Sequence, residues 1–119
     1  MKLQKLISKL EKHHKKKLDL SLGRTFNLLK KLGNPQDKLK NVVTVVGTNA
    51  KASMCYSLKS ILNQAGHKTN LYTSPHILSY TERYIFEDKE IDEENLIELL
   101  TDVEKTLGDD NATLFEILT

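Results

Sequence analysis

The sequence lacks the features that mark secreted and membrane proteins. Its one cysteine, Cys55, cannot form a disulfide within the chain and is typical of a reducing compartment. No apolar run approaches the roughly 18 residues that a membrane span needs, and no apolar core of a signal peptide follows the first residues. The sequence therefore predicts a cytoplasmic protein without a membrane span.

Aromatic residues are also scarce, and none interleaves with the basic run at residues 12–17. Residues 1–40 carry twelve Lys or Arg against three acids, whereas residues 84–119 carry twelve acids against two Lys. The basic segment could attract a nucleic acid, an anionic membrane surface or a polyanionic substrate. It offers no platform on which bases would stack, and a solvated helix face is favoured. The adjacent His13 and His14 point in different directions on a helix, which favours surface histidines over a metal site.

What remains is the composition of one small globular domain, or of a piece of a larger one, with 119 residues of which 39% are hydrophobic. Apolar spacing predicts helices over about 3–16, over 22–32, over 54–65 and from about 92 to a loop at 107–111. Ser21 is the expected cap of the second helix, whose apolar side carries Leu22, Phe26, Leu29 and Leu32. Gly33 and Gly66 are the expected helix stops.

A short β-branched run at residues 42–46 predicts a strand buried on both faces of a parallel sheet. With the following helix and a second strand over 67–73 it would form a right-handed βαβ unit, in an α/β fold. The loop between strand and helix contains Lys51, and a helix N-terminus with a lysine favours phosphate. The loop departs from the general pattern G-x-x-x-x-G-K-[ST], because Val45 and Ala50 replace its glycines and Ser53 lies one position late. An ordinary βα turn is the alternative.

Four further residues are candidates for a site. Ser74 and His76, in the run Thr73-Ser74-Pro75-His76, follow the second predicted strand at the sheet edge. There they could meet the metal of a nucleotide or a second substrate, although a Ser-Pro turn with an incidental histidine explains the pattern equally well. Arg83 is a candidate anion contact, with a surface ion pair to Glu82 or Glu87 as the default. Glu116 lies in an apolar run and needs a metal, a cation partner or an exposed position. Residues 77–89 suit a substrate-facing loop followed by a short strand or hairpin.

Several of these stretches occur together, and in the same order, in one known family. The runs LGNPQDKL (32–39), VGTNAKAS (46–53), AGHK (65–68), LYTSPH (71–76), TER (81–83) and TLFE (113–116) resemble the folylpolyglutamate synthase/dihydrofolate synthase family, a branch of the Mur ligase superfamily. The resemblance extends from about residue 21 to residue 119. It implies a P-loop-containing, Rossmann-like, mostly parallel sheet flanked by helices, with a helical segment over 1–40 and the first, incomplete part of the ATP-binding domain over 41–119.

The resemblance further implies an ATP-dependent ligase of folate biosynthesis that joins L-glutamate to dihydropteroate or a folate through an acyl phosphate. ATP and Mg²⁺ would be its cofactors, and the full-length form would be a monomer with no nucleic-acid or membrane partner. Lys51 would be catalytic, and Ser74 and Glu116 would hold the metal. The residues implied to bind ATP are Gly47, Thr48, Asn49, Ala50, Lys51, Ala52 and Ser53, and those implied to face the folate substrate are Ser74, Pro75, His76 and Arg83.

The loop departs from the family's Gly-Thr-Asn-Gly-Lys-Gly-Ser at Ala50 and Ala52. An alanine at a position that requires positive φ costs about 1 kcal/mol or more. The 119-residue chain alone is expected to be inactive. Two alternatives remain at this point, a nucleotide- or partner-binding module that has lost catalysis and a nucleic-acid binder that uses the basic helix.

Overall fold

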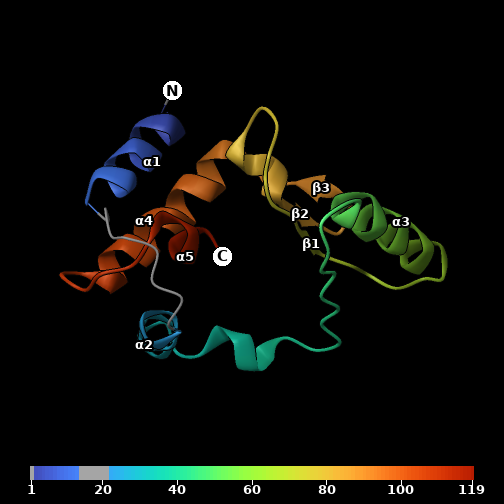
Figure 1. Cartoon of the computed structure of the whole chain (residues 1–119), viewed down its shortest axis with the longest axis horizontal. Coiled ribbons are helices and arrows are strands. Elements are labelled where there is room, and N and C mark those ends of the chain that lie inside the picture. Colours follow the sequence, from blue (N-terminus) through green and yellow to red (C-terminus); the bar gives the residue numbers. More distant parts are fainter. Residues whose placement is uncertain (1, 14–21) are drawn as a thin grey trace. The chain divides into compact units, whose positions relative to one another are not determined.

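The computed structural model describes residues 2–13 and 22–119, which form α-helices, 3₁₀ helices and three short strands. In chain order the elements are α1 (Lys2–His13), α2 (Gly23–Lys31), η1 (Pro35–Lys38), α3 (Lys51–Gln64), β1 (Leu71–Tyr72), η2 (Tyr80–Arg83), β2 (Tyr84–Phe86), β3 (Lys89–Glu90), α4 (Glu93–Leu107) and α5 (Leu114–Leu118) (Figure 1). Helices therefore account for most of the regular structure.

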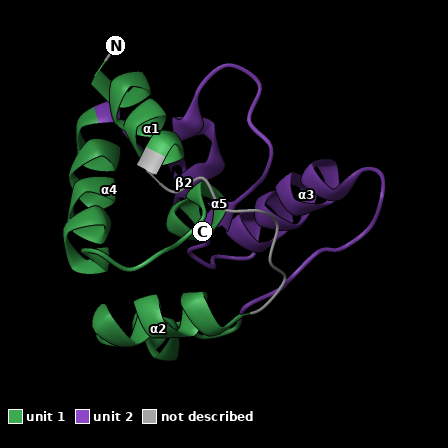
Figure 2. Ribbon diagram, turned by 60° about the vertical axis from the view of Figure 1, so that its left-hand side comes forward, with its two compact units in different colours: residues 1–41, 94–119 green, residues 42–93 purple. Residues whose placement is uncertain are grey.

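The chain forms two compact units (Figure 2). Unit 1 consists of Met1–Asn41 and Glu94–Thr119, and unit 2 consists of Val42–Glu93. The last two helices therefore group with the first two, and α1 packs against α5. The domain boundary between residues 40 and 41 stays a prediction from the sequence.

Apolar burial is concentrated in unit 1. Within the described part of the chain, the buried apolar side chains are Leu3, Ile7, Leu10, Leu28, Leu96, Leu100, Leu107, Ala112, Ile117 and Leu118. All of them belong to unit 1, whereas the buried residues of unit 2 are Thr81 and Arg83, which are polar. Apolar packing thus accounts for the core of unit 1, and polar contacts matter more in unit 2.

The second helix differs from its predicted orientation. Leu22 and Phe26 are 63% and 62% exposed, whereas Leu28 is buried. Arg24 and Leu28 lie one turn apart on the same side of α2, and Arg24 binds a carboxylate of α5, so this side faces the rest of unit 1. The expected cap, Ser21, lies outside the described residues, and the N-cap is Leu22, without a side-chain cap bond.

The predicted helix stops are confirmed. Gly33 and Gly66 have φ values of +81° and +86°, a conformation that costs glycine little. Beyond them, Asn34 N–H donates to the Leu29 carbonyl at 2.8 Å and His67 N–H donates to the Leu62 carbonyl at 3.0 Å. Each helix thus ends in a Schellman-type motif, in which the N–H group of the residue after the glycine bonds back to a carbonyl of the last helical turn.

The sheet of unit 2 is antiparallel, contrary to the predicted βαβ unit. Tyr72 of β1 pairs with Tyr84 of β2, and Phe86 of β2 pairs with Lys89 of β3, so the hairpin expected within residues 77–89 is present. The second predicted strand, 67–73, is reduced to Leu71–Tyr72.

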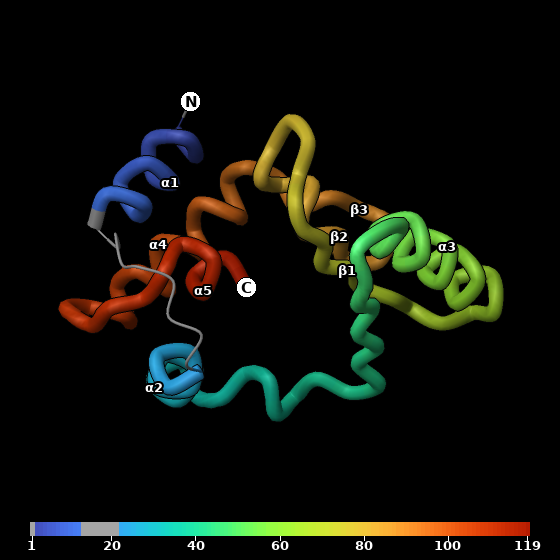
Figure 3. Tube along the Cα trace, viewed as in Figure 1, coloured from blue at the N-terminus to red at the C-terminus, as the bar shows by residue number. Residues whose placement is uncertain are grey.

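Residues 42–46 form no strand, and the prediction of a strand buried on both faces is wrong for this chain. Val42, Val43 and Val46 are 68%, 64% and 84% exposed. A strand requires neighbouring backbone groups, and no segment of residues 2–13 or 22–119 pairs with this one. Figure 3 shows the stretch leading into α3.

Within the described residues, no helix is both long enough and apolar enough to cross a membrane.

Candidate nucleotide and substrate site

The loop before α3 presents its backbone at the surface of unit 2. Gly47 has φ +153°, and Ala50, the N-cap of α3, is left-handed with φ +59° and ψ +15°. The Lys51 ammonium folds back and donates to the Gly47 carbonyl at 2.7 Å. No side chain of the N-cap bonds to the first turn of α3, whose N–H groups have no partner within the helix. A helix N-terminus beside a lysine is an arrangement that favours an anion.

The two alanines of this loop differ in their effect. Ala50 has positive φ, where its Cβ is strained, so the concern raised by the sequence applies there. Ala52 lies within α3, where alanine is a better helix former than glycine. Only the first of the two departures therefore strains the backbone.

The residues after β1 are gathered around Arg83. The Arg83 Nε–H donates to His76 Nδ1 at 2.9 Å, and Nη1 donates to the Ser74 hydroxyl at 3.4 Å. The guanidinium also lies over the ring of Tyr80, 5.3 Å from its centroid. The Ser74–Pro75 peptide bond is cis. The structure thus brings together three residues that the sequence analysis singled out.

Arg83 pairs with neither of the carboxylates that the default interpretation assigned to it. Glu87 contacts Lys68 instead, at 3.2 Å. Glu82 accepts the backbone N–H groups of Ile77, Leu78 and Ser79 at 2.8, 2.7 and 2.6 Å. These bonds, chiefly those from Ile77 and Ser79, lower the pKa of Glu82.

The same bonds fix a loop whose tip is apolar, since Ile77 and Leu78 are both 90% exposed. Sequence reasoning missed this function of Glu82. The signal was present, because Ser79 and Glu82 have the S-x-x-E spacing of a capping box, which the structure forms.

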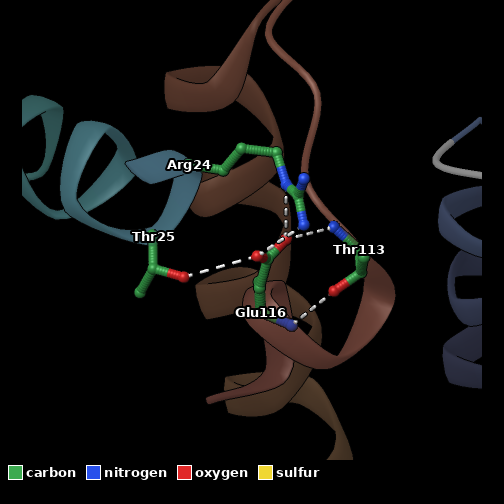
Figure 4. Close-up of polar contacts among 4 residues, drawn as sticks. All are labelled: Arg24, Thr25, Thr113 and Glu116. Atoms are coloured by element: carbon green, nitrogen blue, oxygen red, sulfur yellow. Dashed lines mark hydrogen bonds and ion pairs between the residues drawn. The ribbon is translucent and has the colours of Figure 1, made fainter. Parts of the chain in front are cut away.

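Glu116 lies in unit 1 at the centre of the contacts drawn in Figure 4. Arg24 Nη2 donates to Oε1 at 3.0 Å and Nε donates to Oε2 at 3.3 Å, so the guanidinium binds both carboxylate oxygens. Thr113 N–H donates to Oε2 at 2.6 Å, and the Thr25 hydroxyl donates to Oε1 at 3.5 Å. Of the three options for Glu116, a metal, a cation partner or exposure, the structure shows a cation partner.

Burial acts to raise the pKa of Glu116, but the hydrogen bonds from Arg24 and Thr113 outweigh it and place the pKa below the ordinary glutamate value. The side chains of Arg24 and Glu116 are 17% and 13% exposed. The carboxylate is therefore ionised and held in one orientation.

Comparison with known proteins identifies the family. No family model matches the chain. Over 110 residues the chain is 38% identical to the dihydrofolate synthase/folylpolyglutamate synthase of Escherichia coli, with 92% of this chain and 26% of the relative aligned. The chain belongs to the dihydrofolate synthase/folylpolyglutamate synthase family. The dihydrofolate synthetase of Saccharomyces cerevisiae is 38% identical over 74 residues, covering 62% of this chain and 17% of that protein. The chain thus spans about a quarter of the length of the Escherichia coli synthase and 17% of the yeast protein.

Solved structures of this synthase family have the same fold. Escherichia coli FolC in complex with DHPP and ADP gives a TM-score of 0.83 at 37% identity, over 98% of this chain and 28% of that one. The folylpolyglutamate synthetase of Lactobacillus casei gives 0.84 at 28% identity, over 98% and 30%. The bifunctional synthase of Yersinia pestis complexed with AMPPNP and a Mn ion gives 0.81 at 33% identity, over 97% and 28%.

These relatives are synthases by name, and they do not favour a module that has lost catalysis. Relative to the site implied by the synthase family, Lys51 and its loop lie in unit 2 together with Ser74, Pro75, His76 and Arg83, whereas Glu116 lies in unit 1. Among the described residues, no group of three or more His, Cys, Asp or Glu side chains could hold a metal ion by itself. A metal held here would need oxygen ligands from elsewhere.

Proposed function

We propose that the chain is the nucleotide-binding part of an ATP-dependent ligase that adds L-glutamate to dihydropteroate, to a folate, or to both. The terminal phosphoryl group of ATP would pass to the substrate carboxylate and leave ADP, and the amine of glutamate would then attack the acyl phosphate to form the amide and release phosphate. The observation that carries the proposal is Lys51, folded over its loop at the N-terminus of α3 in a chain of this family. The chain spans about a quarter of its relatives, so the complete reaction is proposed for a polypeptide of their length.

The loop supplies the electrostatic part of the reaction. The N–H groups of the first turn of α3 and the loop amides at residues 47–50 would bind phosphate oxygens. Lys51 would leave the Gly47 carbonyl and place its ammonium on the outer phosphates, where negative charge develops during transfer. Ser53, in the first turn of α3, offers a hydroxyl to the same phosphates.

Mg²⁺ is the implied metal, and the donor set fits it. Mg²⁺ prefers oxygen, and with phosphates and water present it needs only one or two protein ligands. The low pKa of Glu116 in unit 1 keeps it an anion. Ser74 in unit 2 is an exposed residue, and its hydroxyl oxygen, which accepts from Arg83, keeps a second lone pair. Each is proposed as a ligand of Mg²⁺ on the family resemblance, and the ion would neutralise phosphate charge when bound. Arg24 would then release at least one oxygen of Glu116.

The loop after β1 is proposed to face the folate substrate. Its support is the cluster of Pro75, His76 and Arg83, together with the exposed apolar pair Ile77 and Leu78 beside it. A pteroate carries a flat aromatic ring system and polar groups, which suit an apolar edge next to an imidazole.

Other parts of the proposal have support from the sequence alone. They are the mostly parallel sheet of the complete P-loop domain, a monomeric full-length form, a cytoplasmic location and the absence of nucleic-acid and membrane partners.

The phosphate loop is tested by Lys51→Ala in an equilibrium titration of the chain with a fluorescent ATP analogue and Mg²⁺. We expect Lys51→Ala to abolish measurable binding, because the phosphates lose their mobile cation. Lys68→Ala is the matched control, since Lys68 is an 81% exposed lysine of the same unit. Equal affinities of Lys51→Ala and the wild type would show that the loop does not bind phosphate.

The reaction itself is tested by release of ADP that depends on both L-glutamate and dihydropteroate or tetrahydrofolate, in a polypeptide of the relatives' length that contains this chain. The absence of turnover with either acceptor, in a protein that binds ATP, would overturn the ligase assignment while leaving the phosphate loop in place.

A further inference from the structure

Arg83 is a cation with neutral partners. Its residue is 8% exposed, and its guanidinium donates to the His76 ring and the Ser74 hydroxyl while lying over the Tyr80 ring. Among the described residues, no carboxylate forms an ion pair with it. A guanidinium with this degree of burial usually meets a carboxylate. The site therefore uses Arg83 to organise neutral groups.

The direction of the bond to His76 fixes the position of a proton. An arginine side chain has only donors, so a ring nitrogen that lies 2.9 Å from its Nε must accept. His76 Nδ1 consequently carries a lone pair, and the proton of the neutral imidazole is on Nε2. Nε2 lies across the ring from Arg83 and is thereby a donor.

The orientation of the ring is fixed as well. The centroids of the His76 and Tyr80 rings are 4.1 Å apart with an interplanar angle of 42°, so Tyr80 supports one face while Arg83 holds one edge. Arg83 is anchored in turn, because its carbonyl accepts the Thr73 N–H at 3.0 Å directly after β1. Arg83 is thus tied to the sheet of unit 2, and Tyr80, which supports the ring, belongs to the adjoining η2.

We propose that Arg83 is a positioning residue that holds His76 as the Nε2–H tautomer, so that His76 donates a hydrogen bond to an oxygen acceptor of the substrate. This rests on the proposed function for the identity of the substrate, whose oxygen is a carbonyl or carboxylate. Arg83 acts through His76 and does not contact the substrate. It differs in this from the anion contact that the sequence suggested.

The tautomer is tested without any ligand. The histidine ring nitrogens of the ¹⁵N-labelled full chain are observed by NMR at pH 8, with His76→Gln to assign the signal. We expect the wild type to have its proton on Nε2. Arg83→Met, which keeps the length but removes every donor, should give a mixture of the two tautomers, and Arg83→Lys should restore part of the preference.

Backbone amide signals of β2 and β3 report whether each variant keeps its fold, and Lys68→Met is the control for loss of an exposed charge in the same unit. A proton on Nδ1 in the wild type would refute the proposal. So would an unchanged ring spectrum in Arg83→Met with the strands intact.

A double-mutant cycle, measured as the affinity of the full-length polypeptide for dihydropteroate, distinguishes an Arg83 that positions His76 from an Arg83 that contacts the substrate. Loss of one hydrogen bond to the substrate should weaken binding about tenfold in His76→Gln and in Arg83→Met. In the double variant the loss should stay about tenfold if Arg83 acts through His76.

A loss of about a hundredfold in the double variant would mean that Arg83 contacts the substrate itself, and the proposal would fall. If the wild type binds no dihydropteroate, the proposed substrate is wrong, while the ring spectrum still decides how Arg83 positions His76.

Discussion

Replacing Ala50 and Ala52 by glycine, one at a time, should shift the stability of unit 2 in opposite directions. Ala50 has φ +59° and ψ +15°, and the left-handed conformation costs an L-residue about 1 to 2 kcal/mol. Glycine removes this strain, but it also lowers the stability by about 0.4 to 1 kcal/mol because it raises the conformational entropy of the unfolded chain. Ala50→Gly should therefore stabilise by about 0.5 to 1 kcal/mol, whereas Ala52→Gly, within α3, should destabilise by up to about 1 kcal/mol.

The chain has no tryptophan, and its four tyrosines at 56, 72, 80 and 84 all lie in unit 2. Urea unfolding followed by tyrosine fluorescence therefore reports on this unit without a contribution from unit 1. We expect the midpoint to rise for Ala50→Gly and to fall for Ala52→Gly. A fall in both variants would refute the left-handed conformation of Ala50.

Three further outcomes follow from the structure. Arg24→Ala should lower the free energy of unfolding of unit 1 by about 1 to 3 kcal/mol in urea melts followed by far-UV circular dichroism, because Glu116 keeps its position but loses its cation. The control Lys105→Ala, which removes an exposed ion pair, should change this free energy by less than about 0.5 kcal/mol. Equal effects of the two substitutions would contradict the expectation. Gly66→Ala should cost about 1 kcal/mol or more because of its φ of +86°, while Gly23→Ala in α2 should be neutral or stabilising, which thermal melts of both variants can check. The low pKa of Glu116 adds stability that is complete above the ordinary value of 4.5 and is lost as the pH falls through the lower folded value, so Glu116→Gln should flatten the acid limb of a stability–pH curve.

Features set by a few neighbouring residues could be predicted from the sequence. The helix stops at Gly33 and Gly66 depend on one glycine each, and the β2–β3 hairpin on residues within one short stretch. The strand at 42–46 was predicted wrongly because a strand depends on backbone groups elsewhere in the protein, which no local pattern contains.

In the candidate site, too, single residues could be predicted from the sequence, whereas contacts between distant residues could not. The sequence indicated Lys51, Ser74, His76 and Glu116 as single residues, and the family resemblance joined them. It did not show that Arg24 binds Glu116 from a position 92 residues away, since long-range pairing leaves no local signal. The contacts of Arg83 were also missed, because Glu82, its expected partner, is used by the backbone of its own loop.

The valines at 42, 43 and 46 also determine whether the pairing of their segment depends on protein concentration. A helix such as α3 closes its hydrogen bonds within one segment, so its formation is a first-order event at any protein concentration. The 42–46 segment can gain a ladder only from another stretch of backbone, and when a separate molecule supplies it, the process is second order. If a separate molecule supplies the ladder, pairing of the stretch with the strongest strand pattern would therefore depend on protein concentration, whereas the formation of α3 would not.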